Sequence, residues 1–213
     1  MSADERAAFD RLKHPNDKRD YLAAHVALRL VLARAANVPP SQLPLVRDGL
    51  GRPSLVGIPA HFSLTHCAGL VACAVSVAPD AEPVGIDAEP LSAAARVDEI
   101  KALVMTGEEQ NWAEHIEPER GARLVALWTA KEAVLKVRGI GLSGPGGIDE
   151  MRRVVCQPLS WVGAVGRFRS GAESVTTQSV LDSYCLALAR TAPQETGDVV
   201  PELLTFPFDL GVD

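Results

Sequence analysis

The feature that most constrains this chain is a helical segment, residues 127–136 (LWTAKEAVLK), in which charged side chains stand among apolar ones. At about 100° per residue, one face of this helix collects the apolar residues Leu124, Leu127, Trp128, Val134 and Leu135. Lys131 falls near the middle of that face, Glu132 at its edge and Lys136 just beyond it. Because a buried charge without a partner is costly, the segment needs a ligand, a metal or an ion pair. The simplest alternative is an i,i+4 surface salt bridge between Glu132 and Lys136, worth only about 0.3–0.5 kcal/mol.

A second acidic segment, residues 84–89 (VGIDAE), precedes this helix and is typical of a strand. Asp87 and Glu89 are two residues apart, so both side chains leave the same face of that strand. Together with Glu132 they offer three carboxylates from two elements, a set that suits a hard divalent cation, whereas lysines suit phosphate. The alternative for the strand is a solvent-facing end with no ligand.

Composition and length set wide bounds. The chain has 213 residues, 47% of them hydrophobic and 23% charged, as in an ordinary globular protein of one large or two small domains. We find no signal segment and no apolar run long enough to span a bilayer, so we expect a soluble, cytoplasmic protein without a membrane partner. The 4 cysteines form no Cys-x-x-Cys pair and the 5 histidines no His-Glu-x-x-His pattern, which disfavours a disulfide framework and a zinc hydrolase.

The net charge of −6 is unevenly distributed, because residues 1–52 are net basic and the remainder is strongly acidic. A basic N-terminal part is compatible with a local anion site, although a mixed solvated surface would also explain it. The excess is too small for a broad nucleic-acid surface, so we expect no nucleic-acid partner.

Hydrophobic periodicity and turn residues predict the order of elements. We expect helices at 17–36, 93–104, 107–115 (capped by Thr106) and 120–138 (ending at Gly139), turns at 48–53 and 143–147, and strands at 60–65, 70–78, 84–89, 152–157, 161–168 and 184–189. This order of helix, strands, helices and strands again favours an α+β fold.

Residues 84–89 followed by residues 128–136 resemble the paired signature of the 4′-phosphopantetheinyl transferases, in which the second part is W-x-x-K-E-A-x-x-K. The match is to the longer, monomeric, surfactin-synthetase-activating type. Three further pieces occur in order, namely residues 51–53 (GRP), 62–67 (FSLTHC) and 139–142 (GIGL). Five motifs in order are far more specific than one, and the resemblance covers roughly residues 19–145.

The resemblance implies an α+β fold of two similar α/β halves related by pseudo-two-fold symmetry, here approximately residues 1–105 and 106–213, with a coenzyme A cleft between them. It implies a Mg²⁺-dependent transfer of the phosphopantetheine arm of coenzyme A to a serine of an acyl or peptidyl carrier protein, with release of 3′,5′-ADP. The enzyme would act as a monomer.

The resemblance also assigns roles to the charged residues. Asp87, Glu89 and Glu132 would hold Mg²⁺, and Asp87, Glu132 and Lys136 would form the catalytic set. Either Glu132 or a metal-bound water would be the base for the serine. Lys136 would contact the pyrophosphate and offset charge on the leaving phosphate, since such a transfer depends on positioning and charge neutralisation.

By the same resemblance, Arg19, Arg52 and His66 would bind the nucleotide end of coenzyme A, where arginine suits a phosphate. Thr65 keeps the hydroxyl of a serine in the family's pattern and would bind the same ligand. Lys131 would contact coenzyme A, or else bury its stem and extend its ammonium to solvent.

The chain departs from the pattern in two places. Asn16 stands where the family usually has a basic residue, so either Lys18 substitutes for it or that phosphate contact is weaker. Cys67 replaces a serine with a poorer donor. Neither position belongs to the metal set.

Two other functions use the same residues. One is a Mg²⁺-dependent hydrolase of coenzyme A or a related pyrophosphate, and the other is a non-catalytic coenzyme A-binding protein. A thiol nucleophile formed by Cys67 and His66 is disfavoured, because adjacent residues rarely face each other. Since carrier proteins are usually acidic and this chain is also net negative, we expect docking through a local basic or apolar patch.

Overall fold

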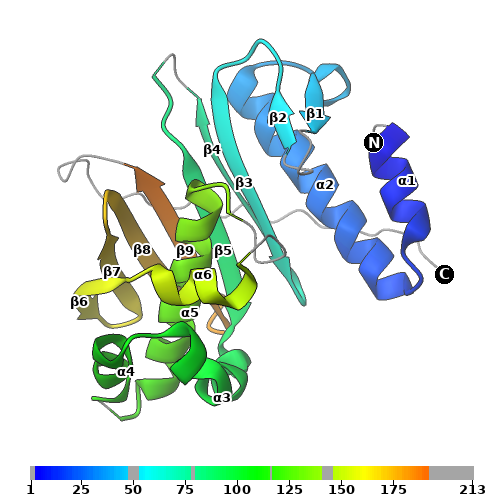
Figure 1. The fold of residues 1–213 in the computed structure, drawn as a ribbon. Coiled ribbons are helices and arrows are strands. Elements are labelled where there is room, and N and C mark those ends of the chain that lie inside the picture. Colours follow the sequence, from blue (N-terminus) through cyan, green and yellow to red (C-terminus); the bar gives the residue numbers. More distant parts are fainter. Residues whose placement is uncertain (1–2, 48–52, 78–79, 116, 141–145, 192–213) are drawn as a thin grey trace.

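The computed structural model describes residues 3–47, 53–77, 80–115, 117–140 and 146–191 (Figure 1). The helices in these ranges are α1 (Ala3–Arg11), α2 (Pro15–Ala36), α3 (Ala94–Val104), α4 (Gly107–Glu114), α5 (Arg120–Val137) and α6 (Gly147–Arg153), with short 3-10 helices η1 (Pro40–Gln42) and η2 (Leu91–Ala93). The strands are β1 (Leu45–Arg47), β2 (Pro53–Leu55), β3 (Ala60–Cys67), β4 (Leu70–Val77), β5 (Val84–Pro90), β6 (Gln157–Val162), β7 (Val165–Ser170), β8 (Glu173–Val180) and β9 (Tyr184–Thr191).

In the N-terminal part, α2 packs against the antiparallel hairpin β3–β4 (Figure 1). Their shared core contains Leu28, Leu32, Ala33, Leu43, Leu55 and Phe62. The helix expected at 17–36 is confirmed, and it begins at Pro15, whose fixed φ and missing N–H suit the first helical position. β1 and β2 pair antiparallel with residue 47 opposite Pro53, as in a hairpin, while residues 48–52 of the expected turn lie outside the described residues.

In the C-terminal part, five antiparallel strands form a sheet in the order β5-β9-β8-β7-β6. Helix α5 packs against β5, β9 and β8 on one side and against α3 and α4 on the other (Figure 1). This arrangement of helices on one face of an antiparallel sheet confirms the expected α+β class. The pseudo-two-fold relation and the division at residue 105 stay predictions. No helix in the described ranges is both long enough and apolar enough to cross a bilayer.

The central position of α5 explains its sequence. Periodicity predicts one buried apolar face, but the buried surface of α5 is wider than that, because every residue from Arg123 to Lys131 is buried. Glu132 and Lys136 are only half-buried, and both point to the side of the helix that meets β5. A helix that is apolar nearly all round is the expected middle layer of a three-layer arrangement.

Two expected helix boundaries are confirmed in detail. The Thr106 hydroxyl accepts a hydrogen bond from the Glu109 N–H, and the Glu109 carboxylate accepts one from the Thr106 N–H, which together form a capping box at the start of α4. Gly139 follows the end of α5 with a φ of 70°, the left-handed conformation that glycine adopts without a steric penalty.

Several expectations for the C-terminal part are wrong. Residues 152–157 are not a strand, because α6 runs to Arg153 and β6 begins only at Gln157. The single strand expected at 161–168 is two strands, β6 and β7, separated by a turn in which Gly163 has a φ of 59°. Strand β8 was not expected, and neither was helix α1 in the N-terminal part. The β8 sequence, ESVTTQSV, is mostly polar, and its buried side includes Glu173 and Thr177, so it lacks an apolar alternation.

The two parts meet where β3 lies alongside β5, although these strands belong to separate sheets in the described structure. At this contact, hydrogen bonds from side chains to the backbone connect the two strands. The Ile86 N–H donates to Ser63 Oγ at 3.1 Å, and Lys136 Nζ on α5 donates to the Ile86 carbonyl at 2.9 Å and the Leu64 carbonyl at 3.4 Å. Lys136 therefore links β3, β5 and α5.

The close approach of α5 to β5 depends on Gly85. A Cβ atom at residue 85 would lie 2.1 Å from the Ala133 carbonyl oxygen and 2.8 Å from the Val137 backbone nitrogen. Both contacts are with helix backbone, which cannot move aside as a flexible side chain can. Glycine at this position therefore sets the distance between the strand and the helix.

We predict that Gly85→Ala destabilises the protein by about 3 kcal/mol, since overpacking against a rigid neighbour forces the backbone to shift. The measurement is the free energy of unfolding in urea. Gly107→Ala is the matched control, because a Cβ there meets nothing within 4 Å. Equal stabilities of the two variants would contradict this account of the α5–β5 contact.

Candidate metal centre

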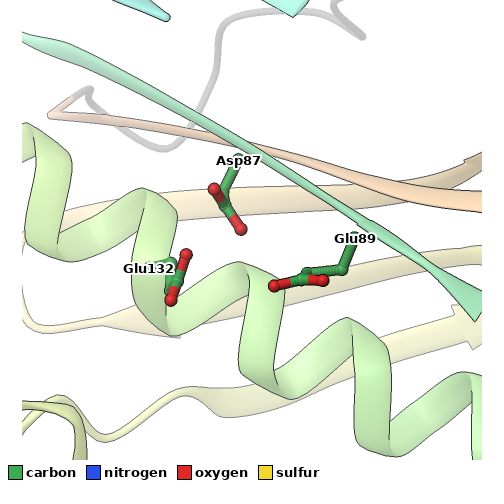
Figure 2. Close-up of side chains that lie close together, drawn as sticks. All are labelled: Asp87, Glu89 and Glu132. Carbon is green, nitrogen blue, oxygen red and sulfur yellow. The ribbon is translucent and has the colours of Figure 1, made fainter. Parts of the chain in front are cut away.

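Three carboxylates converge between β5 and α5 (Figure 2). Strand β5 supplies Asp87 and Glu89 from one face, as the two-residue spacing predicts, and α5 supplies Glu132 from the facing turn. One oxygen from each of the three groups lies within 4.8 Å of the other two. The structure thus brings together the three residues that the sequence nominates as metal ligands.

Asp87 is almost completely buried, at 3% exposure, and its two oxygens differ in their surroundings. Oδ1 accepts hydrogen bonds from the Thr65 hydroxyl at 2.9 Å and from Lys136 Nζ at 2.8 Å. Oδ2 is also buried, but no N–H or hydroxyl of the described residues donates to it. A buried carboxylate oxygen without a donor is unusual and indicates a missing partner.

Glu132 shows the electrostatic cost of this arrangement. Burial, and then the negative charge of Asp87, raise the pKa of Glu132 to about 8; a hydrogen bond to Asp87 and the charge of Glu89 add to the shift, and the ammonium of Lys136 opposes it. Two carboxylates this close cannot both be ionised cheaply unless a proton or a cation lies between them.

Glu89 is held from two sides. Trp128 Nε1 donates to Glu89 Oε1 at 3.2 Å, and Arg96 Nη2 donates to both carboxylate oxygens at 3.1 Å. The Arg96 guanidinium also lies 5.9 Å from the centre of the Trp128 ring. These contacts fix the direction of the Glu89 carboxylate at the edge of the cluster.

The chemistry of this donor set fits a hard divalent cation such as Mg²⁺. All candidate ligand atoms are carboxylate oxygens, and Asp87 Oδ2 is a buried acceptor in need of a positive partner. Three carboxylates would leave other coordination positions for water and phosphate oxygens, which Mg²⁺ commonly keeps. We therefore name Asp87, Glu89 and Glu132 as the residues that would hold it.

Lys131 lies elsewhere and corrects two expectations. Its side chain has no exposure, so the ammonium does not extend to solvent. Lys131 Nζ forms an ion pair with Glu109 at 2.8 Å and also donates to the carbonyls of Met151 and Val154. These three contacts use its three donors, so the geometry does not support a role in coenzyme A binding and indicates a structural one.

The residues expected at the nucleotide end come from different elements. Arg19 is exposed on α2 beside Asp20, and His66 is exposed near the end of β3. Thr65 is buried, with its hydroxyl proton directed to Asp87 rather than to a cleft. Arg52 lies outside the described residues. Burial raises the pKa of the Cys67 thiol to about 11, which further disfavours a thiol nucleophile.

Sequence reasoning missed three contributors. Nothing in the sequence pairs Arg96 with Glu89, apart from its position on the helix that follows the acidic strand. Trp128 was read only as an apolar residue, although an indole N–H usually finds an acceptor when buried. Glu109 was seen as a helix-start residue, and its pairing with Lys131 joins segments that are far apart in the chain.

The fold and this centre define an α+β protein with a candidate divalent-metal site at the contact of a strand and a helix. Comparison with known families agrees with the motifs, because residues 83–189 match the model of the 4′-phosphopantetheinyl transferase superfamily. This range covers half of the chain and includes all three carboxylates. The chain therefore belongs to this superfamily.

Individual relatives support the same assignment. The chain is 26% identical to the putative 4′-phosphopantetheinyl transferase slr0495 of Synechocystis sp., across 100% of the chain and 89% of that protein. It is 28% identical to 4′-phosphopantetheinyl transferase Sfp of Bacillus subtilis and 31% identical to psf-1 of Bacillus pumilus. These two alignments cover 68% and 67% of the chain but only 63% and 60% of the relatives. The resemblance to the Sfp-like type is confirmed.

We predict that Lys131→Met lowers the free energy of unfolding by about 3–5 kcal/mol, because it leaves the Glu109 carboxylate buried without its counter-charge. The double variant Lys131→Met/Glu109→Gln should lose less of the free energy of unfolding, because it leaves no unpaired carboxylate in the core. Urea unfolding measures both. The control is Arg153→Ala, which breaks an ion pair to Glu150 in which the arginine is 69% exposed, and should cost less than about 1 kcal/mol. A Lys131→Met variant as stable as this control would refute the structural role.

We predict that Mg²⁺ alone, without coenzyme A, binds the full chain and raises its unfolding temperature, and that Asp87→Asn weakens this binding by at least about tenfold. Calorimetric titration with MgCl₂ gives the affinity, and thermal unfolding gives the stabilisation. The exposed Asp149→Asn on α6 is the control and should bind like the wild type. Unchanged binding by Asp87→Asn would place the cation elsewhere.

Proposed function

We propose that this chain transfers the 4′-phosphopantetheine arm of coenzyme A to a serine hydroxyl of an acyl or peptidyl carrier protein and releases 3′,5′-ADP. The observation that carries the proposal is the convergence of Asp87, Glu89 and Glu132 within the range that matches the superfamily. The curated activity in the names of the relatives, 4′-phosphopantetheinyl transferase, supports the same reaction.

The reaction breaks the bond between the two phosphates of coenzyme A and forms a bond from the serine oxygen to the phosphate next to pantetheine. When bound by the three carboxylates, Mg²⁺ would supply positive charge to the pyrophosphate. The remaining requirement is to place the phosphates and the serine and to offset negative charge as it develops on the leaving phosphate.

Lys136 is suited to part of this task. Its ammonium already donates to Asp87 Oδ1 and to the Leu64 and Ile86 carbonyls, but its side chain is 31% exposed. It would therefore offset phosphate charge through the field of its ammonium, not through a donor that is free in this structure. We assign it the dual role of neutralising Asp87 and offsetting phosphate charge. The base for the serine proton would be either Glu132, at the same cluster, or a water molecule bound at the metal site.

The nucleotide end of coenzyme A would be bound by the basic residues of the N-terminal part. Arg19 and His66 are both exposed, and Arg19 pairs with Asp20 on the same helix at 3.7 Å, so each is accessible to an anion. Arg52 belongs to the same proposal by its place in the Gly-Arg-Pro motif. The division into two halves at residue 105 would place this end of the ligand on the N-terminal half.

The partners follow from the reaction. The second substrate is a carrier protein, and we propose that the chain works in the cytoplasm as a monomer, without a nucleic-acid or membrane partner. The net charge of −6 does not favour binding to nucleic acid.

The test is intact-protein mass spectrometry of apo carrier proteins incubated with the full chain, coenzyme A and Mg²⁺. We predict that a carrier gains the mass of one phosphopantetheine arm, and that Glu132→Ala lowers the rate by about 10²–10³-fold, as loss of a key electrostatic group does. Glu108→Ala, an exposed glutamate on α4, should leave the rate unchanged.

Two other results would replace the proposal. Breakdown of coenzyme A without any modified carrier would indicate a hydrolase that uses water in place of serine. Binding of coenzyme A with no reaction on any carrier, and an affinity that is indifferent to Glu132→Ala, would indicate a non-catalytic binding protein.

A further inference from the structure

Strand β3 presents two different faces. Phe62 and Leu64 belong to the core that packs on α2, so the alternate residues Ser63 and Thr65 face β5. Ser63 accepts a hydrogen bond from the Ile86 backbone, and Thr65 donates one to the Asp87 side chain. The two hydroxyls therefore act on consecutive residues of β5, and only the second acts on the metal centre.

The Thr65 hydroxyl has one proton to donate, and the structure directs it to Asp87 Oδ1 at 2.9 Å in a region from which solvent is largely excluded. Lys136 Nζ donates to the same oxygen at 2.8 Å. With both donors on Oδ1, the carboxylate cannot rotate without losing two hydrogen bonds. The Asp87 carboxylate, whose Oδ2 has no donor among the described residues, is thereby held in place beside Glu89 and Glu132.

We propose that Thr65 is a positioning residue for the metal ligand Asp87, and that this contact, rather than one with coenzyme A, is its main contribution. The inference rests on the metal centre of the proposed function. It gives the N-terminal hairpin a direct part in the site, because Thr65 lies on β3 whereas the three carboxylates come from β5 and α5. Hydrogen-bond partners of metal ligands typically affect metal affinity by about 10–100-fold.

The experiment compares Thr65→Val with Thr65→Ser in the full chain, by calorimetric titration with MgCl₂ in the absence of coenzyme A. Valine keeps the shape and removes the donor, whereas serine keeps the donor. We expect Thr65→Val to raise the Kd for Mg²⁺ by about tenfold or more, and Thr65→Ser to remain within about threefold of the wild type.

Coenzyme A affinity, measured with EDTA present, separates the two roles. We expect this affinity to be the same in the wild type, Thr65→Val and Thr65→Ser. A Thr65→Val variant that binds Mg²⁺ like the wild type would overturn the inference, and a selective loss of coenzyme A binding would assign Thr65 to that ligand instead. A Thr65→Ser variant that binds Mg²⁺ as weakly as Thr65→Val would also overturn it, since the hydroxyl alone would then not account for the affinity.

Thr177→Val is the matched control. Thr177 is a fully buried threonine on β8 whose hydroxyl donates to the Gly166 carbonyl, so its loss reports the general cost of removing a buried donor. Thr177→Val should leave Mg²⁺ affinity unchanged.

Thr65→Ala replaces Thr65→Val in the experiment if Thr65→Val does not fold. If the wild type itself binds no Mg²⁺, the metal centre of the proposed function fails and the inference falls with it; if only the variants behave unlike the expectation, the inference alone is wrong.

Discussion

The contact between the backbones of β5 and α5 at Gly85 is the constraint on which the rest of the structure depends. The helix carbonyl of Ala133 lies where a side chain at residue 85 would begin, so no other residue allows the same distance. At this distance, Lys136 reaches the Ile86 carbonyl and the Asp87 carboxylate together. A site assembled from a strand and a helix needs such a fixed separation, because carboxylates that are to share a cation must meet within a few ångströms.

The charges on α5 are balanced by different means on two faces of the helix. Lys131 is neutralised inside the protein by Glu109, with every donor satisfied, and this part of the helix requires nothing from solution. Glu132, one residue further, faces the Asp87 carboxylate, and the nearby ammonium of Lys136 offsets only part of the repulsion. The same helix thus contains a closed ion pair that stabilises the core and an open acidic cluster that needs a cation or a proton.

Much of this arrangement could be predicted from the sequence, and the failures have physical causes. The two-residue spacing of Asp87 and Glu89 fixes their common face, and the capping residues fix the start of α4 and the end of α5. The partner of Lys131 could not be predicted, because periodicity describes one helix and gives no information on which distant segment covers it. Strand β8 was missed for a related reason: its inward side chains, Thr177 among them, are buried on the face of the sheet that packs on α5 although they are mostly polar, so the sequence shows no apolar alternation.

The position of Lys131 also changes how the family motif should be interpreted. In W-x-x-K-E-A-x-x-K, adjacent residues point about 100° apart on a helix, so the first lysine and the glutamate necessarily serve different surroundings. Here Trp128 orients Glu89, and Lys131 bonds to Glu109 on α4 and to the C-terminal end of α6. Glu132 and Lys136 face the acidic cluster. A motif match therefore identifies the helix as a unit, and only the packing around it separates the residues that hold the site in place from those that can contact a metal or a phosphate.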